Sequence, residues 1–271
     1  MAPGDRSTGG SVAEPDLREL RRWVPAFDPA RTRTRVRVLC FPYAGAGVSA
    51  FRGWQEAMPP EVEALPVQLP GRESRWHEPA IINLSALGRV LTTVLRPMLD
   101  APYAVFGHSM GGLIAFEFVR HLRRAQIAAP VHLFVSSARA PHVPDRELPL
   151  HLLPDEAFLA QLVARSGAIP AQALHNLELA RALLPTLRAD FGMCETYYPL
   201  PEEPLDIPIT VYGGRHDRMV VPSDLVGWNM YTRRGFKLQL LAGDHFFVNQ
   251  QCGAFLSTFA ADLAVIASAE P

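Results

Sequence analysis

Short apolar runs alternate with longer helical patterns along most of this chain. Runs rich in β-branched and aromatic residues occupy positions 36–41, 63–69, 103–106, 131–136, 209–212 and 237–241. Apolar residues recur three and four positions apart over 84–99, 112–124 and 246–267, which is typical of helices. Because strands that alternate with helices form a sheet of parallel strands covered by helices on its faces, we expect an α/β fold with a mainly parallel central sheet.

One long segment departs from this alternation. From about residue 141 to residue 201 there is no convincing strand, and two helical patterns cover 154–165 and 172–197. A helical insertion between two strands of a parallel sheet is typical of a lid that lies over one end of the sheet. Its apolar residues, which we expect mainly to pack against one another, include Phe158, Leu159, Leu162, Leu177 and Leu184.

The length and composition favour one folded domain. The chain has 271 residues, of which 48% are hydrophobic and 20% are charged, as in proteins that bury a sizeable core. Residues 1–22 mix Gly, Ser, Asp, Glu and Arg without an apolar stretch, so we expect them to be disordered and not to form a secretory signal. The predicted domain therefore covers residues 23–271.

Charge and cysteine content argue against several classes of protein. A formal net charge of −1, with arginines scattered along the chain, gives no basis for nucleic-acid binding. The sequence contains no run of about 18 apolar residues, so it does not predict a membrane span. Cys40, Cys194 and Cys252 are widely spaced, so they predict neither a disulfide framework nor a metal site, and they favour a cytoplasmic location. The oligomeric state stays open, and a monomer is one possibility.

The segment 103–112 runs from an apolar strand directly into a helix through Gly107-x-Ser109-x-Gly111. This is the pattern of a nucleophile elbow, in which a serine sits in a tight turn and strand and helix pass so closely that neighbouring positions must be small. We therefore predict an α/β-hydrolase fold with Ser109 as nucleophile at the start of a helix. The neighbouring His108 is expected to serve packing and hydrogen bonding.

A serine nucleophile needs a base and a carboxylate that orients the base, and in this fold the chain order is serine, acid, histidine. The histidines after Ser109 are His121, His132, His142, His151, His175, His216 and His245. Only His245 lies between the last predicted strand and the last predicted helix, so it is the predicted base. Asp217 follows a buried strand that ends in two glycines and is the predicted acid. Asp244 is the alternative, although neighbouring residues in a short loop usually point apart.

The oxyanion of a tetrahedral intermediate needs backbone N–H donors. The first predicted donor is Met110, the residue after the nucleophile. The second should come from the glycine-rich loop after the first strand, residues 40–47. Tyr43 is the first residue with an N–H after Pro42, so we assign it, with Ala44 as the alternative.

Together these segments resemble the type II thioesterases that accompany polyketide synthases and nonribosomal peptide synthetases. The segments that carry the resemblance, in chain order, are 41–45, 68–75, 107–112, 213–217 and 243–247. The resemblance extends from about residue 23 to the last helix. It implies a stand-alone enzyme that hydrolyses acyl thioesters from the phosphopantetheine arms of acyl or peptidyl carrier proteins and so removes aberrant or stalled units. The resemblance implies no cofactor, because phosphopantetheine belongs to the substrate.

Two alternatives use the same residues differently. A carboxylester or lipid hydrolase would have the same catalytic side chains, and an inactive carrier-protein-binding module would keep the fold without the chemistry. Because carrier proteins are usually acidic, we also hypothesise that basic side chains form a docking face. The candidates for this face are Arg72 with Arg75, or Arg120 with Arg123 and Arg124.

Overall fold

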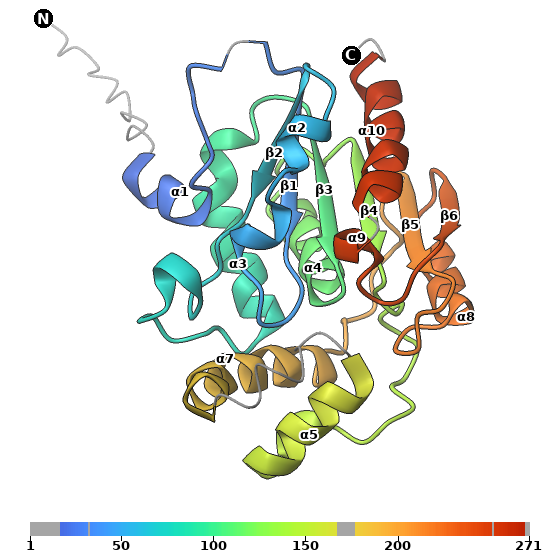
Figure 1. Cartoon of the computed structure of the whole chain (residues 1–271). Helices are drawn as coiled ribbons and strands as arrows, with labels where there is room; N and C mark the ends of the chain where they lie inside the picture. The colour runs from blue at the N-terminus through green and yellow to red at the C-terminus, as the bar shows by residue number, and fades with distance from the viewer. Residues whose placement is uncertain (1–16, 32, 167–176, 251, 269–271) are drawn as a thin grey trace, which may run out of the picture.

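The computed structural model describes residues 17–31, 33–166, 177–250 and 252–268 (Figure 1). Six parallel strands form one sheet in the order β2-β1-β3-β4-β5-β6. The strands are β1 (Val36–Phe41), β2 (Val62–Pro66), β3 (Tyr103–His108), β4 (His132–Ser136), β5 (Ile209–Gly214) and β6 (Phe236–Leu241). The predicted α/β fold with a parallel central sheet is therefore confirmed.

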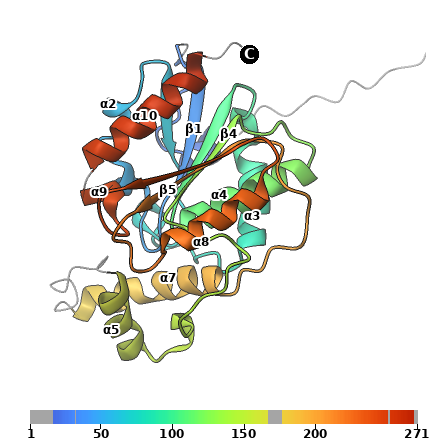
Figure 2. The same cartoon turned by 90° about the vertical axis from the view of Figure 1, so that its right-hand side faces the viewer.

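Helices cover both faces of the sheet (Figure 2). Helices α3 (Leu84–Leu95) and α4 (Met110–Arg124) pack on one face, and α2 (Trp54–Ala57) and α10 (Cys252–Ser268) lie on the other. Successive residues of a strand point to opposite faces. In β3, Val105 therefore packs in the apolar cluster under α3 and α4, and Phe106 packs in the cluster under α2 and α10. The central strand is thus buried on both sides, as the apolar run predicts.

The remaining elements are short, except for α5 and α7. They are α1 (Leu17–Trp23), η1 (Val48–Phe51), η2 (Glu73–Arg75), η3 (Arg96–Met98), η4 (Leu150–Leu152), α5 (Asp155–Ser166), α7 (Leu177–Glu195), α8 (Pro222–Val226), η5 (Gly227–Tyr231) and α9 (Phe247–Gln250). Elements labelled η are 3-10 helices.

Several predicted boundaries differ from the structure, and two of them lie close to the loops that matter below. Strand β2 ends at Pro66, not at residue 69, because the side-chain amide of Gln68 donates to the carbonyl oxygens of Leu69 and Arg72 and holds a turn there. Helix α4 begins at Met110, two residues earlier than predicted. Intrinsic propensity disfavours glycine in a helix, but the tertiary packing around residues 111–112 overrides this preference.

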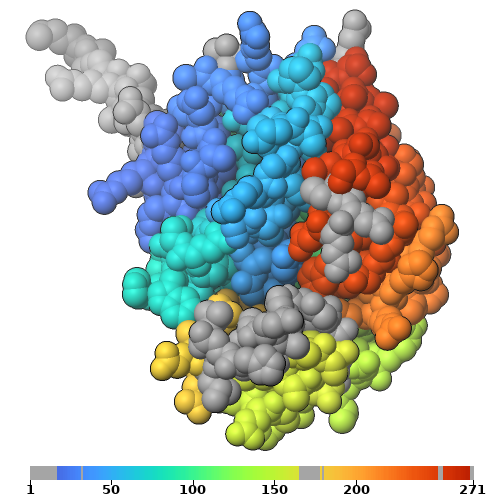
Figure 3. Space-filling model, in the orientation of Figure 1, coloured from blue at the N-terminus to red at the C-terminus, as the bar shows by residue number. Residues whose placement is uncertain are grey.

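The helical insertion follows β4 and precedes β5, and η4, α5 and α7 are its described helices (Figures 1 and 3). In the described part of the predicted range 141–201 there is no strand. Phe158, Leu162 and Leu184 belong to a small apolar cluster of their own, with Leu159 packed against it, as expected. The side chain of Leu177 and residues 172–176 lie outside what the structure describes.

The prediction that residues 1–22 are disordered is wrong for residues 17–22, which form a helix. Residues 1–16 lie outside the described ranges, whereas residues 17–22 belong to α1. Leu20 and Trp23 are buried, and the indole N–H of Trp23 donates to Glu19 at 3.0 Å. Apolar burial at Leu20 and Trp23 therefore orders a segment whose composition alone favoured disorder.

A membrane-spanning segment would need a long apolar helix. In the described ranges no helix meets that requirement.

The close approach of β1 to α4 generates a test of the fold. A Cβ added to Gly111 would lie 2.1 Å from the carbonyl oxygen of Phe41 and 2.8 Å from that of Pro42. Backbone must shift to relieve such a clash, so Gly111→Ala should lower the free energy of unfolding by about 3 kcal/mol or more. Urea denaturation followed by circular dichroism would measure this loss.

Gly253 in α10 provides the matched control, because among the described residues no heavy atom outside its chain neighbours and its own helix backbone lies within 4 Å of its added Cβ. Gly253→Ala should keep or slightly raise the urea midpoint, since alanine favours helices. A Gly111→Ala protein that unfolds at the parent's urea concentration would contradict this account of the β1–α4 contact.

Candidate active site

Four loops meet at one edge of the sheet because all six strands run in the same direction. The loops that follow β1, β3, β5 and β6 carry Tyr43, Ser109, Asp217 and His245, respectively. Ligand sites of open parallel sheets lie at this carboxyl edge. The fold thus gathers predicted site residues that are distant in the sequence.

Ser109 occupies a strained turn between β3 and α4. Its φ of 54° and ψ of −119° lie in a region that residues other than glycine rarely adopt. The turn is fixed on both sides, because the Ser109 N–H donates to the Ser136 carbonyl oxygen at 2.7 Å and the Ser109 carbonyl oxygen accepts from Gly112 N–H at 2.9 Å. The hydroxyl of Ser109 lines a cleft at the start of α4, as the elbow pattern predicts.

A continuous hydrogen-bonded chain links the hydroxyl to a carboxylate. Nε2 of His245 lies 3.0 Å from Oγ of Ser109, and Nδ1 of His245 lies 2.8 Å from Oδ2 of Asp217. The second oxygen of Asp217 accepts from the backbone N–H groups of Met219 and Val220 at 2.8 and 2.9 Å. This arrangement fixes both the carboxylate and the imidazole ring.

The alternative acid, Asp244, is directed elsewhere. Its Oδ1 accepts from the N–H of Phe246, two residues further on, at 2.8 Å. The side chain thus closes a local turn, which is a common role for aspartate in loops. The structure pairs His245 with Asp217.

Burial and hydrogen bonds compete at Asp217. Burial opposes ionisation, but hydrogen bonds from His245 and from the Val220 N–H outweigh it, so the pKa of the Asp217 carboxyl lies below its usual value. The carboxylate is therefore the stable form beside His245.

His108 lies next to His245 but is not part of the hydrogen-bonded chain Asp217–His245–Ser109. Its ring centroid is 5.3 Å from that of His245, and its Nδ1 lies 2.9 Å from Oγ of Ser136. Burial lowers the pKa of His108 well below the usual value, and the neighbouring His245 lowers it further. His108 is thus a neutral packing and hydrogen-bonding residue, as its position suggested.

The loop after β1 approaches the start of α4 from the other side. Tyr43 and Ala44 both line the cleft that contains Ser109. The ring of Tyr43 packs edge-on against Phe246, with centroids 5.2 Å apart, and its hydroxyl accepts from Asn249 at 2.9 Å. These contacts bind the loop after β1 to the loop that carries His245.

The cleft has a volume of about 550 Å³ and combines polar and apolar walls. Ser109 and His245 lie on its sheet side. The insertion contributes an apolar wall made of Leu162, Leu183, Leu187 and Phe191. The space therefore suits an apolar chain whose reactive end reaches Ser109.

The segment 68–75 supports this site in a way that the sequence analysis missed. The side-chain oxygen of Gln68 accepts from the N–H of Val48 at 3.3 Å. The carboxylate of Glu73 accepts from the Ser49 N–H at 3.2 Å and from the Ser49 hydroxyl at 2.5 Å. In the sequence this segment stands out only through the family resemblance, and no local pattern reveals its pairing with η1.

The structure contradicts the proposed docking role of Arg72 and Arg75. Arg72 is buried and forms a bidentate ion pair with Asp190 at 2.7 and 2.8 Å. Arg75 is also buried, pairs with Glu78 at 2.6 Å and stacks over the ring of Trp23 at 4.0 Å. Burial requires a charge to be paired within the chain, so neither guanidinium is free for a partner.

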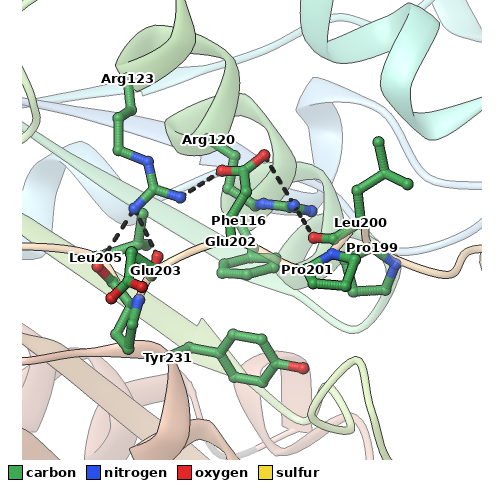
Figure 4. Close-up of a pocket in the computed structure, with 11 residues that line it drawn as sticks. Phe116, Arg120, Arg123, Pro199, Leu200, Pro201, Glu202, Glu203, Leu205 and Tyr231 are labelled. Carbon is green, nitrogen blue, oxygen red and sulfur yellow. Dashed lines mark hydrogen bonds and ion pairs between the residues drawn. The ribbon is translucent and has the colours of Figure 1, made fainter.

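The second group of arginines, of which Figure 4 shows Arg120 and Arg123, is also paired internally. Arg120 is buried against Glu117 at 2.8 Å, and Arg123 and Arg124 both pair with Glu202. These residues fasten α4 to the segment after α7, and some of them line a small pocket of about 100 Å³. Arg120 is buried, so the docking hypothesis is contradicted there, whereas the side chains of Arg123 and Arg124 are 35% and 33% exposed and their part in docking stays a prediction.

Metal binding would need several ligands close together. Within the described ranges, no group of three or more His, Cys, Asp or Glu side chains is placed to hold a metal ion.

Comparison with known proteins agrees with this geometry. The family model described as "Thioesterase domain" matches residues 36–263. The gramicidin S biosynthesis protein GrsT of Aneurinibacillus migulanus is 42% identical, over 86% of this chain and 90% of its own length. The RedJ thioesterase of the prodiginine pathway in Streptomyces coelicolor has a TM-score of 0.79 and 38% identity, covering 87% of this chain and 90% of RedJ.

A second solved structure, the type II thioesterase BorB from the borrelidin biosynthetic cluster, has a TM-score of 0.78 at 34% identity and covers 88% of this chain and 96% of BorB. The resemblance to type II thioesterases, first seen in five short segments, thus extends over most of the chain and its fold. The chain belongs to the thioesterase domain family of α/β-hydrolase enzymes.

Proposed function

We propose that this enzyme is a type II thioesterase that hydrolyses acyl thioesters from the phosphopantetheine arms of carrier proteins, and so removes aberrant or stalled units during polyketide or nonribosomal peptide synthesis. The observation that carries the proposal is the hydrogen-bonded chain Asp217–His245–Ser109 at the wall of an apolar cleft. Named relatives from gramicidin S, prodiginine and borrelidin biosynthesis support the biosynthetic context.

In the first half-reaction, Oγ of Ser109 attacks the thioester carbonyl carbon while Nε2 of His245 takes its proton. The observed 3.0 Å separation of these atoms suits direct proton transfer. Asp217 holds the ring so that Nδ1 keeps its proton and stabilises the imidazolium that forms. The C–S bond then breaks, and His245 returns the proton to the departing thiol.

The charge that develops on the carbonyl oxygen needs preorganised donors. We assign this role to the backbone N–H groups of Met110 and Tyr43, with Ala44 as the alternative to Tyr43. The close contact between the loop after β1 and the start of α4 supports the assignment. The N-terminus of α4 adds a favourable electrostatic contribution.

In the second half-reaction, water attacks the acyl-serine with His245 as base and releases the carboxylic acid. A thiol with a pKa of about 8.5 departs with little assistance, so the site needs no additional acid for the leaving group. The insertion would act as a lid whose apolar wall receives the acyl chain. A carrier protein is the proposed partner. Its phosphopantetheine arm extends from its surface, so the acyl group at the end of the arm could enter the cleft and reach Ser109.

Removing the nucleophile or the base should abolish this chemistry. Ser109→Ala and His245→Ala should each lower kcat for acyl-carrier hydrolysis by about 10⁶-fold, since the first variant lacks the nucleophile and the second lacks the base that activates it. His216→Ala is the control, because His216 is an exposed loop histidine next to Asp217 and should retain parental activity. Undiminished acyl release by Ser109→Ala would refute the mechanism and favour the inactive-module alternative.

The paired state of Asp217 predicts a pH-dependent stability. The pKa of the Asp217 carboxyl is lower in the folded protein than the value of about 3.9 in unfolded chains. Ionisation of this carboxyl therefore stabilises the folded state at pH values above about 3.9. This stabilisation is lost as the pH falls through the pKa of the folded state. The difference in unfolding free energy between the parent and Asp217→Asn should therefore shrink as the pH falls below about 4.

Urea denaturation between neutral pH and the lowest pH at which both proteins stay folded would measure this difference. Asp206→Asn is the control, because Asp206 pairs with Arg234 at the exposed surface and its replacement should have little effect at any pH. A parent–variant difference that grows on acidification would contradict the sign of the shift.

Substrate class separates the proposal from an ester or lipid hydrolase. Acyl-pantetheine thioesters should be hydrolysed with a higher kcat/KM than the matched oxygen esters, because the site supplies no extra group to assist a poor alkoxide leaving group. A strong preference for the oxygen esters would overturn the thioesterase assignment. Repeating the assay with acylated carrier proteins of varied chain length would define the natural substrate.

A further inference from the structure

Helix α7 of the insertion presents one buried carboxylate to the loop after β1. The side chain of Asp190 is 0% exposed. Its Oδ2 accepts from the Gly45 N–H at 2.7 Å and from Nη1 of Arg72 at 2.7 Å, while its Oδ1 accepts from Nη2 of Arg72 at 2.8 Å. One carboxylate thus joins three segments that are far apart in the sequence.

Arg72 is itself held in place, so it can fix the carboxylate. Its Nε donates to the Pro70 carbonyl oxygen at 3.2 Å, and its side chain is 6% exposed. A buried carboxylate is costly unless it is paired and hydrogen-bonded, and a bidentate guanidinium is the strongest common partner. The pair gives Asp190 a defined orientation toward Gly45.

Gly45 belongs to the turn that carries the assigned oxyanion donor. The Ala46 N–H donates to the Tyr43 carbonyl oxygen at 3.1 Å and closes this turn over residues 43–46. A Cβ added to Gly45 would lie 2.6 Å from Cδ2 of Leu187, so the turn lies directly against α7. Any shift of α7 would therefore be transmitted to the turn.

We propose that Asp190, fixed by Arg72, is a positioning residue for hydrolysis, because its bond to Gly45 holds the turn 43–46 so that the backbone donor faces the developing oxyanion. This inference rests on the proposed function, in which that turn supplies one oxyanion donor. If Asp190 has this role, both oxyanion donors are in place only when α7 packs against the turn 43–46. The helix that lines the acyl cleft thus also contributes to catalysis.

Two variants test the proposal in the full-length enzyme. Asp190→Asn leaves a single acceptor oxygen for the donors of Gly45 and Arg72. The double variant Arg72→Met with Asp190→Leu removes both charges, so that no buried charge is left unpaired and the fold is least affected. Both proteins keep Ser109, His245 and Asp217.

Both variants should lower kcat by about 10- to 100-fold with little change in KM, since a misplaced donor weakens transition-state binding more than substrate binding. The second readout is the affinity for a trifluoromethyl ketone analogue of the acyl-pantetheine, which forms a tetrahedral oxyanion adduct with Ser109. Its affinity should fall by a factor similar to that of kcat. Thermal unfolding would be measured in parallel.

Glu195→Gln is the matched control. Glu195 lies on the same helix, its side chain is 9% exposed, and it accepts from the N–H groups of Leu150 and His151 at 2.8 and 3.0 Å. This carboxylate holds η4 of the insertion, and within the described residues it forms no hydrogen bond or ion pair with the turn 43–46. Glu195→Gln should lower thermal stability without changing kcat or the affinity for the analogue.

Parental kcat and analogue affinity in either Asp190 variant would overturn the positioning role. If the double variant does not fold, Asp190→Asn decides the question alone. A parent enzyme that neither hydrolyses acyl-pantetheine thioesters nor binds the analogue would instead refute the proposed function. The two failures are therefore distinguishable.

Discussion

All six strands of the sheet run in the same direction, and the position of every group in the site depends on this constraint. Because the carboxyl ends share one edge, the loops after β1, β3, β5 and β6 converge there. The strained backbone of Ser109 is maintained because β3 is buried in the middle of the sheet and α4 packs directly beside it. The packed core thus provides the free energy that keeps Ser109 in a strained, partly buried turn beside the cleft.

The charged side chains near the cleft show how burial decides the role of a residue. Arg72 and Arg120 are almost completely buried, and each forms an ion pair with a carboxylate from a nearby or distant segment. Breaking such a pair leaves one charge unpaired in a medium of low polarity, which is strongly destabilising. These arginines therefore hold segments together, because Asp190 lies on α7 and Glu202, which also pairs with Arg120, lies in the segment after it.

Helix α7 contacts both the cleft proposed to receive the acyl chain and the loop that carries the assigned oxyanion donor. Leu187 and Phe191 form part of the apolar wall of the cleft, while Asp190 on the same helix bonds to the loop that carries the assigned oxyanion donor. A helix that received an acyl chain on one side and fixed the catalytic loop on the other would couple substrate fit to reaction rate. Such coupling suits an enzyme that has to select among acyl groups.

The order and approximate bounds of the strands and helices follow from the sequence, because apolar periodicity is a local property of the chain. Ser109 and His245 also follow from it, since the elbow pattern and the required chain order leave few alternatives. The sequence favoured Asp217 over Asp244 as the acid, and the tertiary structure added the contact itself, between Nδ1 of His245 and Oδ2 of Asp217. The burial of Arg72 and its contact with Asp190 were decided by the tertiary structure alone. They depend on the direction of side chains and on contacts between segments more than a hundred residues apart, and no local pattern encodes either.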